Sequence, residues 1–190
     1  MHERNNMENK KKYITNGWLA VVIVALILII DQIIKIEVKT NMTLGEAIRI
    51  TDWFYIEFIE NNGMAYGMTF FNKLVLSLFR TFAIGAITWY IWRVVKTGIF
   101  SRGYVVCLAM ILAGAAGNLI DCLFYGLIFD ASTPFSVADF VPFGTGYSTF
   151  LHGKVVDMFY FPIIRTTYPD WVPMVGGDDF VFFSPIFNFA

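Results

Sequence analysis

Asp157 is the residue whose surroundings in this sequence most directly suggest chemistry. It lies in the stretch LHGKVVDMFYFP, between two valines and a run of Met, Phe, Tyr and Phe. An ionised carboxylate is costly to bury among apolar side chains, so Asp157 either reaches water or has a functional role. The last stretch of the chain, SPIFNFA, is a second apolar phrase with one polar residue, Asn188. We expect the two stretches to be connected in the fold.

Three more ionisable residues lie inside long apolar segments: Asp31, Lys35 and Arg80. Such groups are expensive within a membrane and are usually functional, although pairing for structure is a competing explanation. Asp31 and Lys35 are one helical turn apart, a spacing that sets opposite charges side by side, and we interpret them as a structural pair. Alternatively, Lys35 could extend to phosphate head groups. Arg80 could do the same or could pair with an inward carboxylate.

Polar residues also follow a run of small ones in the segment LAGAAGNLIDC. The small residues at 114–117 predict a face for close helix packing. Asn118 and Asp121 come next, three residues apart on one helical face, and they either bond a neighbouring helix or line a site at the membrane surface. In the separate stretch ENNGMAYG, Gly63 predicts a tight turn.

Three apolar segments must position these residues. The chain has 190 residues, of which 57% are hydrophobic and 15% charged, too apolar a composition for an ordinary soluble domain. Residues 18–36, 74–92 and 104–125 are each long enough to cross the hydrocarbon layer as a helix. The first could be a signal peptide, but it is long and no small-residue cleavage site follows it. An uncleaved anchor is therefore predicted.

The positions of lysine and arginine predict how the chain crosses the membrane. The tail 1–12 is basic, and the turn between the second and third segments carries Arg93, Lys96 and Arg102. The positive-inside rule places both in the cytoplasm, which leaves 37–72 and 126–190 outside. The β-branched and aromatic residues of the outer stretches predict short strands.

Other classes of function are disfavoured by the composition. The net charge of −1 provides no basic surface for nucleic acid. His2 lies in the tail and His152 stands apart from any ligand spacing, so neither a metal nor another cofactor is expected. Cys107 and Cys122 are too far apart on one helix to form a disulfide and are interpreted as apolar fillers.

Five blocks occur in a specific order along the chain: DQIIK, ENNGMAYG, GAAGNLID, GKVVDMF and PIFNFA. In this order they resemble the lipoprotein signal peptidase family, also called signal peptidase II, over nearly the whole chain from Asp31 onward. The resemblance implies a membrane-embedded aspartyl peptidase that removes signal peptides from bacterial prolipoproteins, cutting before the cysteine that carries a diacylglyceryl group. A non-enzymatic transporter or assembly subunit, using Asp31, Lys35 and Arg80 as a polar relay, is the alternative.

The resemblance also implies an architecture and a location. The fold class is an all-α transmembrane helical bundle of four spans with a small extracytoplasmic β-sheet cradle. The location is the bacterial inner membrane, with both termini in the cytoplasm and the active site at the outer leaflet. A monomer is expected, in contact with membrane lipids and a prolipoprotein substrate.

Roles follow from the resemblance residue by residue. Asp157 matches the first of two catalytic carboxylates that act on one water, one as a general base and the other as an acid. The residues matched to positions that contact substrate or position the catalytic pair are Asn61, Gly63, Asn118 and Asn188. The residues assigned to support of the site are Asp31, Lys35 and Asp121.

The chain departs from the family pattern in three places. Cys122 stands where the family usually has arginine, and an insert over roughly 127–152 predicts an enlarged outer loop over the site. The family's last block continues as Phe-Asn-x-Ala-Asp into a fourth span, whereas this sequence ends at Ala190. We expect the second catalytic aspartate and its helix to be missing by truncation. Asp139, in the similar phrase FSVAD, precedes the Asp157 block and is interpreted as a loop residue.

Overall fold

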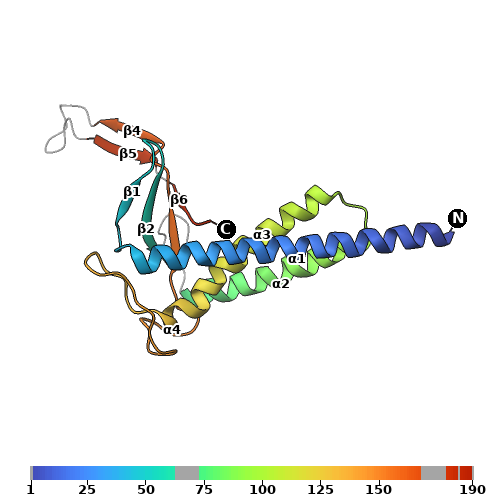
Figure 1. The fold of residues 1–190 in the computed structure, drawn as a ribbon, viewed down its shortest axis with the longest axis horizontal. Coiled ribbons are helices and arrows are strands. Elements are labelled where there is room, and N and C mark those ends of the chain that lie inside the picture. Colours follow the sequence, from blue (N-terminus) through green and yellow to red (C-terminus); the bar gives the residue numbers. More distant parts are fainter. Residues whose placement is uncertain (1, 63–72, 168–178, 184, 190) are drawn as a thin grey trace.

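The structure is a computed structural model that describes residues 2–62, 73–167, 179–183 and 185–189. Among these residues are three long helices, α1 (His2–Asn41), α2 (Lys73–Thr97) and α3 (Arg102–Ile120), of which α3 runs at a slant to the other two (Figure 1). α3 packs against both α1 and α2. The N-terminus lies at one end of the helices and a small β-sheet stands near the other (Figure 1).

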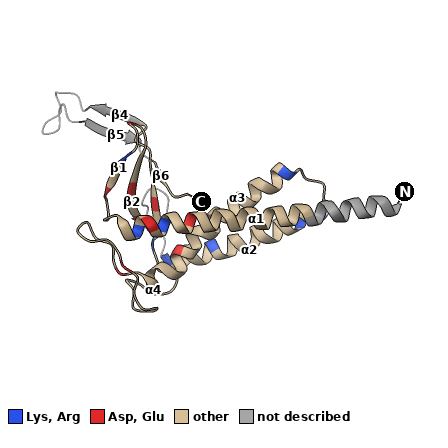
Figure 2. Cartoon of the chain, in the orientation of Figure 1, with Lys and Arg blue, Asp and Glu red and all other residues tan. Residues whose placement is uncertain are grey.

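Three helical segments of the described chain are long and apolar enough to cross a membrane: Thr15–Asn41, Lys73–Thr97 and Arg102–Ile128. A 27-residue helix is about 40 Å long at 1.5 Å per residue, which exceeds the roughly 30 Å of a hydrocarbon layer. Many large apolar side chains point outward from these helices, as Phe82 does with 76% exposure. Figure 2 shows long uncharged stretches along the helices, with most charged residues toward their ends. This surface suits lipid.

All three helices differ in length from the predicted segments. α1 begins at His2 instead of 18 and ends at Asn41 instead of 36. α2 continues beyond 92 to Thr97. The third segment stops being α-helical at Ile120 and continues as the π-helix η2 (Asp121–Tyr125) and the short α4 (Gly126–Ile128). Apolar composition indicates the membrane span, but a helix continues into polar flanks because each added residue gains a backbone hydrogen bond.

The packing face of α3 differs from the predicted run of small residues at 114–117. Its buried residues are Val105, Ala109, Ala113 and Gly117, four residues apart. Consecutive residues point in different directions around a helix, so only residues three or four apart share one face. Small residues at this spacing let a neighbouring helix approach closely.

The predicted outer strands are present and form a four-stranded antiparallel sheet in the order β1-β2-β3-β6. Its strands are β1 (Ala47–Arg49), β2 (Tyr55–Asn61), β3 (Val155–Tyr160) and β6 (Ile186–Phe187). A separate two-stranded sheet pairs β4 (Ile164–Thr167) with β5 (Asp179–Phe183). Segments from the stretches 37–72 and 126–190 therefore meet at β3, which carries Asp157.

One hydrophobic cluster joins this sheet to the helices. Phe58 of β2 and Val156 and Met158 of β3 are fully buried against the end of α1 and against Tyr125 of η2. Each buried side chain of this size stabilises the fold by about 1.5–3 kcal/mol. Val156 and Met158 of β3 point into this cluster. Because successive strand residues point to opposite faces, Asp157 must point away from the cluster.

The insert forms a backbone cap on the end of the third span. The last carbonyl groups of a helix have no partner within that helix and are costly near lipid. Here the amides of the insert supply partners: Ser148 N donates to Gly126 O at 2.8 Å, Gly144 N to Leu127 O at 3.0 Å and Val141 N to Ile128 O at 2.9 Å. The enlarged loop predicted for 127–152 is therefore bonded to the span that precedes it.

Two glycines make this close approach possible. A Cβ at Gly153 would lie 2.1 Å from Asp121 O, and one at Gly146 would lie 2.3 Å from Gly126 O. Both contacts are with backbone and are far shorter than any real Cβ contact. A side chain at Gly146 would push the insert away from α4, and one at Gly153 would push the chain away from η2, where the polar residues described next are found.

Candidate active site

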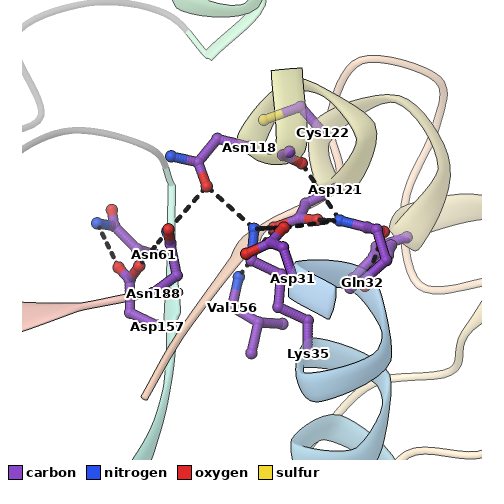
Figure 3. A network of polar contacts seen from close by, with 12 residues as sticks. Asp31, Gln32, Lys35, Asn61, Asn118, Asp121, Cys122, Val156, Asp157 and Asn188 are labelled. Carbon is purple, nitrogen blue, oxygen red and sulfur yellow. Dashed lines mark hydrogen bonds and ion pairs between the residues drawn. The ribbon is translucent and has the colours of Figure 1, made fainter. Parts of the chain in front are cut away.

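Asp157 is held by two side-chain amides, one on each side of β3. It lies opposite Ile59 of β2, and Asn61, two residues further along β2, shares its face of the sheet. Asn61 Nδ2 donates to Asp157 Oδ2 at 3.0 Å. β6 pairs with the other edge of β3, and Asn188, directly after β6, donates from Nδ2 to Asp157 Oδ1 at 2.9 Å. Both carboxylate oxygens therefore accept a hydrogen bond (Figure 3).

The amide of Asn188 also links Asp157 to the helices. Asn188 Nδ2 donates to Asn118 Oδ1 at 2.8 Å, and the same oxygen accepts from Lys35 Nζ at 3.1 Å. Asn118 is on α3 and Lys35 is on α1. A continuous hydrogen-bonded chain thus runs from the first span to the carboxylate on the sheet (Figure 3).

Lys35 forms an ion cluster with two carboxylates. Its Nζ lies 3.0 Å from Asp31 Oδ2 and 2.7 Å from Asp121 Oδ2, and all three side chains are 0% exposed. The Asp31–Lys35 pair predicted from their spacing is confirmed, whereas the alternative that Lys35 extends to head groups is wrong. Three oxygen partners within the protein compensate for the cost of removing the ammonium from water.

Gln32 completes the cluster on the helix side. Its Nε2 donates to Asp121 Oδ1 at 2.9 Å and to Asp31 Oδ2 at 3.1 Å, while its Oε1 accepts from Tyr125 OH at 3.2 Å. Asp121 also accepts from the backbone amide of Val156 at 3.4 Å. Asp121 therefore ties the start of η2 to the residue that precedes Asp157.

The surroundings of Asp157 change its acidity. Burial raises the pKa of Asp157 above its usual range, partly offset by the hydrogen bonds from Asn61 and Asn188 and by the positive charges of Lys35 and Arg80. The residue is 5% exposed. A raised pKa makes a carboxylate a stronger base once it is ionised, which suits the side chain to accept a proton.

A second buried ion cluster lies on the opposite face of β2, centred on Glu60. Lys39 Nζ is 2.5 Å from Glu60 Oε1, and Lys154 Nζ is 2.7 Å from Glu60 Oε2. Lys39 also donates to Ser132 Oγ of the insert at 2.8 Å. Because Glu60 is adjacent to Asn61, this cluster anchors the strand end that positions Asn61 against Asp157.

Three further residues considered in the sequence analysis are Gly63, Arg80 and Asp139. Gly63 lies outside the described residues. Arg80 of α2 donates from Nη1 to Cys122 Sγ at 3.4 Å, so a guanidinium from another helix reaches the position where the family pattern has arginine. Asp139 is exposed in the insert, and its backbone amide donates to Asp130 Oδ1 at 2.8 Å. Among the described residues, the structure gives Asp157 no hydrogen bond to a carboxyl group.

Sequence reasoning missed Gln32, Lys39 and Glu60. One signal was available for Lys39, because Asp31, Lys35 and Lys39 follow one another at intervals of four and therefore share one face of a helix. Glu60 gave no such signal, since its partners come from α1 and from the segment after the insert.

Within the described ranges, no three His, Cys, Asp or Glu side chains gather in a way that could hold a metal ion. The polar groups that contact Asp157 are the side-chain NH₂ groups of Asn61 and Asn188, which donate hydrogen bonds to it. This arrangement suits proton transfer at a carboxylate.

Comparison with known proteins gives the family. The sequence model of the family described as signal peptidase (SPase) II matches residues 23–190, nearly the whole chain. This chain belongs to the signal peptidase II family. A lipoprotein signal peptidase of Porphyromonas gingivalis is 46% identical over 174 residues, covering 92% of this chain and 76% of that protein. One of Amoebophilus asiaticus is 36% identical over 179 residues, covering 91% and 71%.

Two solved structures have a similar fold. Both are described as bacterial membrane enzyme structures obtained by the in meso method, at 2.3 Å and 1.9 Å resolution. Each aligns with a TM-score of 0.56 over 90% of this chain, covering 77% and 81% of the solved chains at 21% and 22% identity. The helices and sheet of this signal peptidase II family member are therefore an arrangement that also occurs in a membrane enzyme.

Proposed function

We propose that this protein is an aspartyl endopeptidase that removes the signal peptide from diacylglyceryl-modified prolipoproteins, cutting before the lipidated cysteine. Family membership supports the reaction class. The observation that carries the proposal is the position of Asp157, whose two oxygens are held by Asn61 and Asn188 beside membrane-length helices. A substrate with an apolar signal helix and lipid tails must be met at membrane depth, where a soluble protease could not reach it.

Asp157 acts as the general base in this proposal. Ionised, it takes a proton from the attacking water, while a second carboxyl group, protonated, polarises the scissile carbonyl and then helps the amine to leave. Two carboxyl groups a few ångströms apart share one proton near neutral pH and titrate as a pair. The amides around Asp157 add no charge to such a pair.

The partner of Asp157 is proposed to be the aspartate that the family resemblance sets after the Phe-Asn-x-Ala block, and not Asp139. Asp31 and Asp121 are already engaged by Lys35, and Asp139 is an exposed residue of the insert. Asn188 belongs to this block and contacts Asp157 directly. An aspartate three residues after Asn188 would be at most about 10 Å from it along the chain, which keeps the same carboxylate within its reach.

The orientation is also a proposal. The turn between α2 and α3 is flanked by Arg93 and Lys96 near the end of α2 and by Arg102 at the start of α3, at the end of the helices away from the sheet. The positive-inside rule then places this turn and the N-terminus in the cytoplasm, and the sheet with Asp157 at the outer leaflet of the bacterial inner membrane. A fourth span, a monomeric state and contact with membrane lipids belong to the same proposal.

The direct test is cleavage of a diacylglyceryl-modified prolipoprotein by the purified full-length protein, followed by the shift of the product on a gel. Cleavage is expected with the lipidated substrate and not with the same prolipoprotein lacking the lipid. If the full-length protein leaves the lipidated substrate intact, the enzyme proposal is wrong. A transporter or assembly role would then return, although neither the family match nor the relatives favour it.

Replacing Asn61 or Asn118 by alanine should weaken cleavage less than the loss of Asp157. Both are proposed to bind and align the substrate, whereas Asp157 carries the proton transfer. We expect each alanine variant to lose about tenfold to a hundredfold in kcat/KM, measured with the lipidated substrate at neutral pH. Asn62→Ala is the matched control, since Asn62 follows β2 and is exposed. An unchanged kcat/KM in either site variant would remove that residue from the substrate-binding set.

A further inference from the structure

Each of the three N–H groups of the Lys35 ammonium has an oxygen partner. An ammonium carries three donors and no acceptor. Lys35 Nζ contacts three oxygens: Asp31 Oδ2 at 3.0 Å, Asp121 Oδ2 at 2.7 Å and Asn118 Oδ1 at 3.1 Å. Because the side chain is 0% exposed, water does not compete for these positions. The third proton is therefore committed to the amide of Asn118.

This commitment determines which way the next two amides point. An asparagine side chain can present either its oxygen or its NH₂ group, so its orientation is decided by its partners. Asn118 must turn its oxygen toward Lys35, because the NH₂ group would place two donors together. The same oxygen accepts from Asn188 Nδ2 at 2.8 Å, and the other proton of that NH₂ group goes to Asp157 Oδ1 at 2.9 Å.

We propose that Lys35 is a positioning residue that, through Asn118 and Asn188, forces a hydrogen-bond donor onto the catalytic carboxylate of Asp157. The side chains are Lys35 of α1, Asn118 of α3 and Asn188 after β6. Because Lys35 can only donate hydrogen bonds, the two amides can adopt only one orientation. This inference rests on the proposed function of Asp157. It gives Lys35 a defined effect on catalysis beyond its ion pair.

The same arrangement determines what the substrate meets. With Asn118 Oδ1 and Asn188 Nδ2 engaged, Asn118 Nδ2 and Asn188 Oδ1 have no hydrogen-bond partner among the described residues. They form one donor and one acceptor beside Asp157. An extended peptide backbone carries the complementary carbonyl and amide groups. Lys35 therefore also determines where the site offers a donor and where it offers an acceptor to a bound peptide.

A simpler electrostatic explanation must be separated from this one. The charged groups that influence Asp157 are Lys35 of α1 and Arg80 of α2, and the positive charge of Lys35 alone favours the ionised carboxylate. Asp31 and Asp121 lie on the far side of Lys35, with Asp121 reaching β3 at the amide of Val156. A variant that breaks the amide chain but keeps every charge distinguishes the two explanations.

The experiment measures the acid limb of the pH profile of kcat/KM for the full-length protein with the lipidated prolipoprotein. Asn118→Leu keeps all the charges and the approximate volume but removes the amide between Lys35 and Asn188. Lys35→Gln removes the donor-only group. Asp31→Asn is the matched control, since it disturbs the same ion cluster but leaves Lys35 on Asn118. Thermal unfolding in detergent identifies variants that do not fold.

If Lys35 orients the amides of Asn118 and Asn188, Asn118→Leu and Lys35→Gln should each move the acid limb to higher pH by about one unit, since a donor to the ionised carboxylate is lost. Asp31→Asn should not move it upward. If the acid limb of folded Asn118→Leu does not move, the proposed role of Lys35 is wrong, even if the acid limb of Lys35→Gln shifts. If Lys35→Gln fails to fold, Asn118→Leu decides alone. Absence of cleavage by the unsubstituted protein would overturn the proposed function itself, which is a different result.

Discussion

Replacing Asp157 by asparagine in the full-length protein should abolish cleavage of the lipidated prolipoprotein. The amide has nearly the shape of the carboxylate but cannot accept the proton of the attacking water. General-base catalysis contributes about 10²–10⁴-fold in rate, and at least this loss in kcat is expected. The measurement is single-turnover cleavage at neutral pH, with product followed on a gel.

The fold of the Asp157→Asn variant should survive. Asn61 and Asn188 both donate to Asp157, so an asparagine there leaves one donor facing another NH₂ group. The expected cost is about 1–3 kcal/mol, measured by thermal unfolding in detergent. Asp139→Asn is the control, since Asp139 is an exposed loop residue, and its cleavage rate should be unchanged. Retained cleavage by Asp157→Asn together with loss in Asp139→Asn would show that the base had been assigned to the wrong aspartate.

Replacing Glu60 by alanine should destabilise the fold more than any other substitution proposed above. It leaves Lys39 fully buried without the carboxylate that lies 2.5 Å away. Removing one partner of a buried ion pair costs about 3–5 kcal/mol, because the remaining charge is uncompensated. Lys154 is partly exposed and can turn to water. The measurement is the unfolding midpoint in detergent, with Glu57→Ala on the same strand as the control, expected to change stability by about 0.5 kcal/mol or less.

A double substitution sharpens this test. Lys39→Met in the Glu60→Ala background removes the uncompensated charge, so part of the lost stability should return. If the double variant is less stable than Glu60→Ala by the full effect of Lys39→Met alone, the two residues are not energetically coupled. The Glu60 cluster would then not be the anchor of the strand end beside Asn61.

The stability from Glu60 should also depend on pH. Burial alone would raise the pKa of Glu60, but the attraction of Lys39 and the hydrogen bonds from Lys154 and Lys39 outweigh it and leave the pKa below its usual value. A carboxyl group whose pKa is lower in the folded state stabilises the fold above its unfolded pKa. This contribution starts to decline as the pH falls below the unfolded-state pKa of about 4.3, and it is lost as the pH falls through the lower folded-state value. Glu60→Gln should abolish that part of the acid dependence.

The sequence by itself determined the elements of this protein and the contacts within them. Apolar runs of membrane length predict helices, because in lipid a segment must satisfy its own backbone hydrogen bonds. The spacing of Asp31 and Lys35 predicts their pair, because the geometry of one helix turn sets that distance. The order of the five blocks was sufficient to indicate the family to which the chain belongs.

Only the tertiary structure decided which side chains meet between elements. Lys35 meets Asn118 across 83 residues, and Asn61 meets Asp157 across 96. No local period connects residues so far apart. Their contact depends on how α1 packs on α3 and on the register of β2 with β3, and a shift of one residue in that register would turn Asp157 to the opposite face. The two carboxylates on Lys35, the Glu60 cluster and the amides around Asp157 follow from that packing and register.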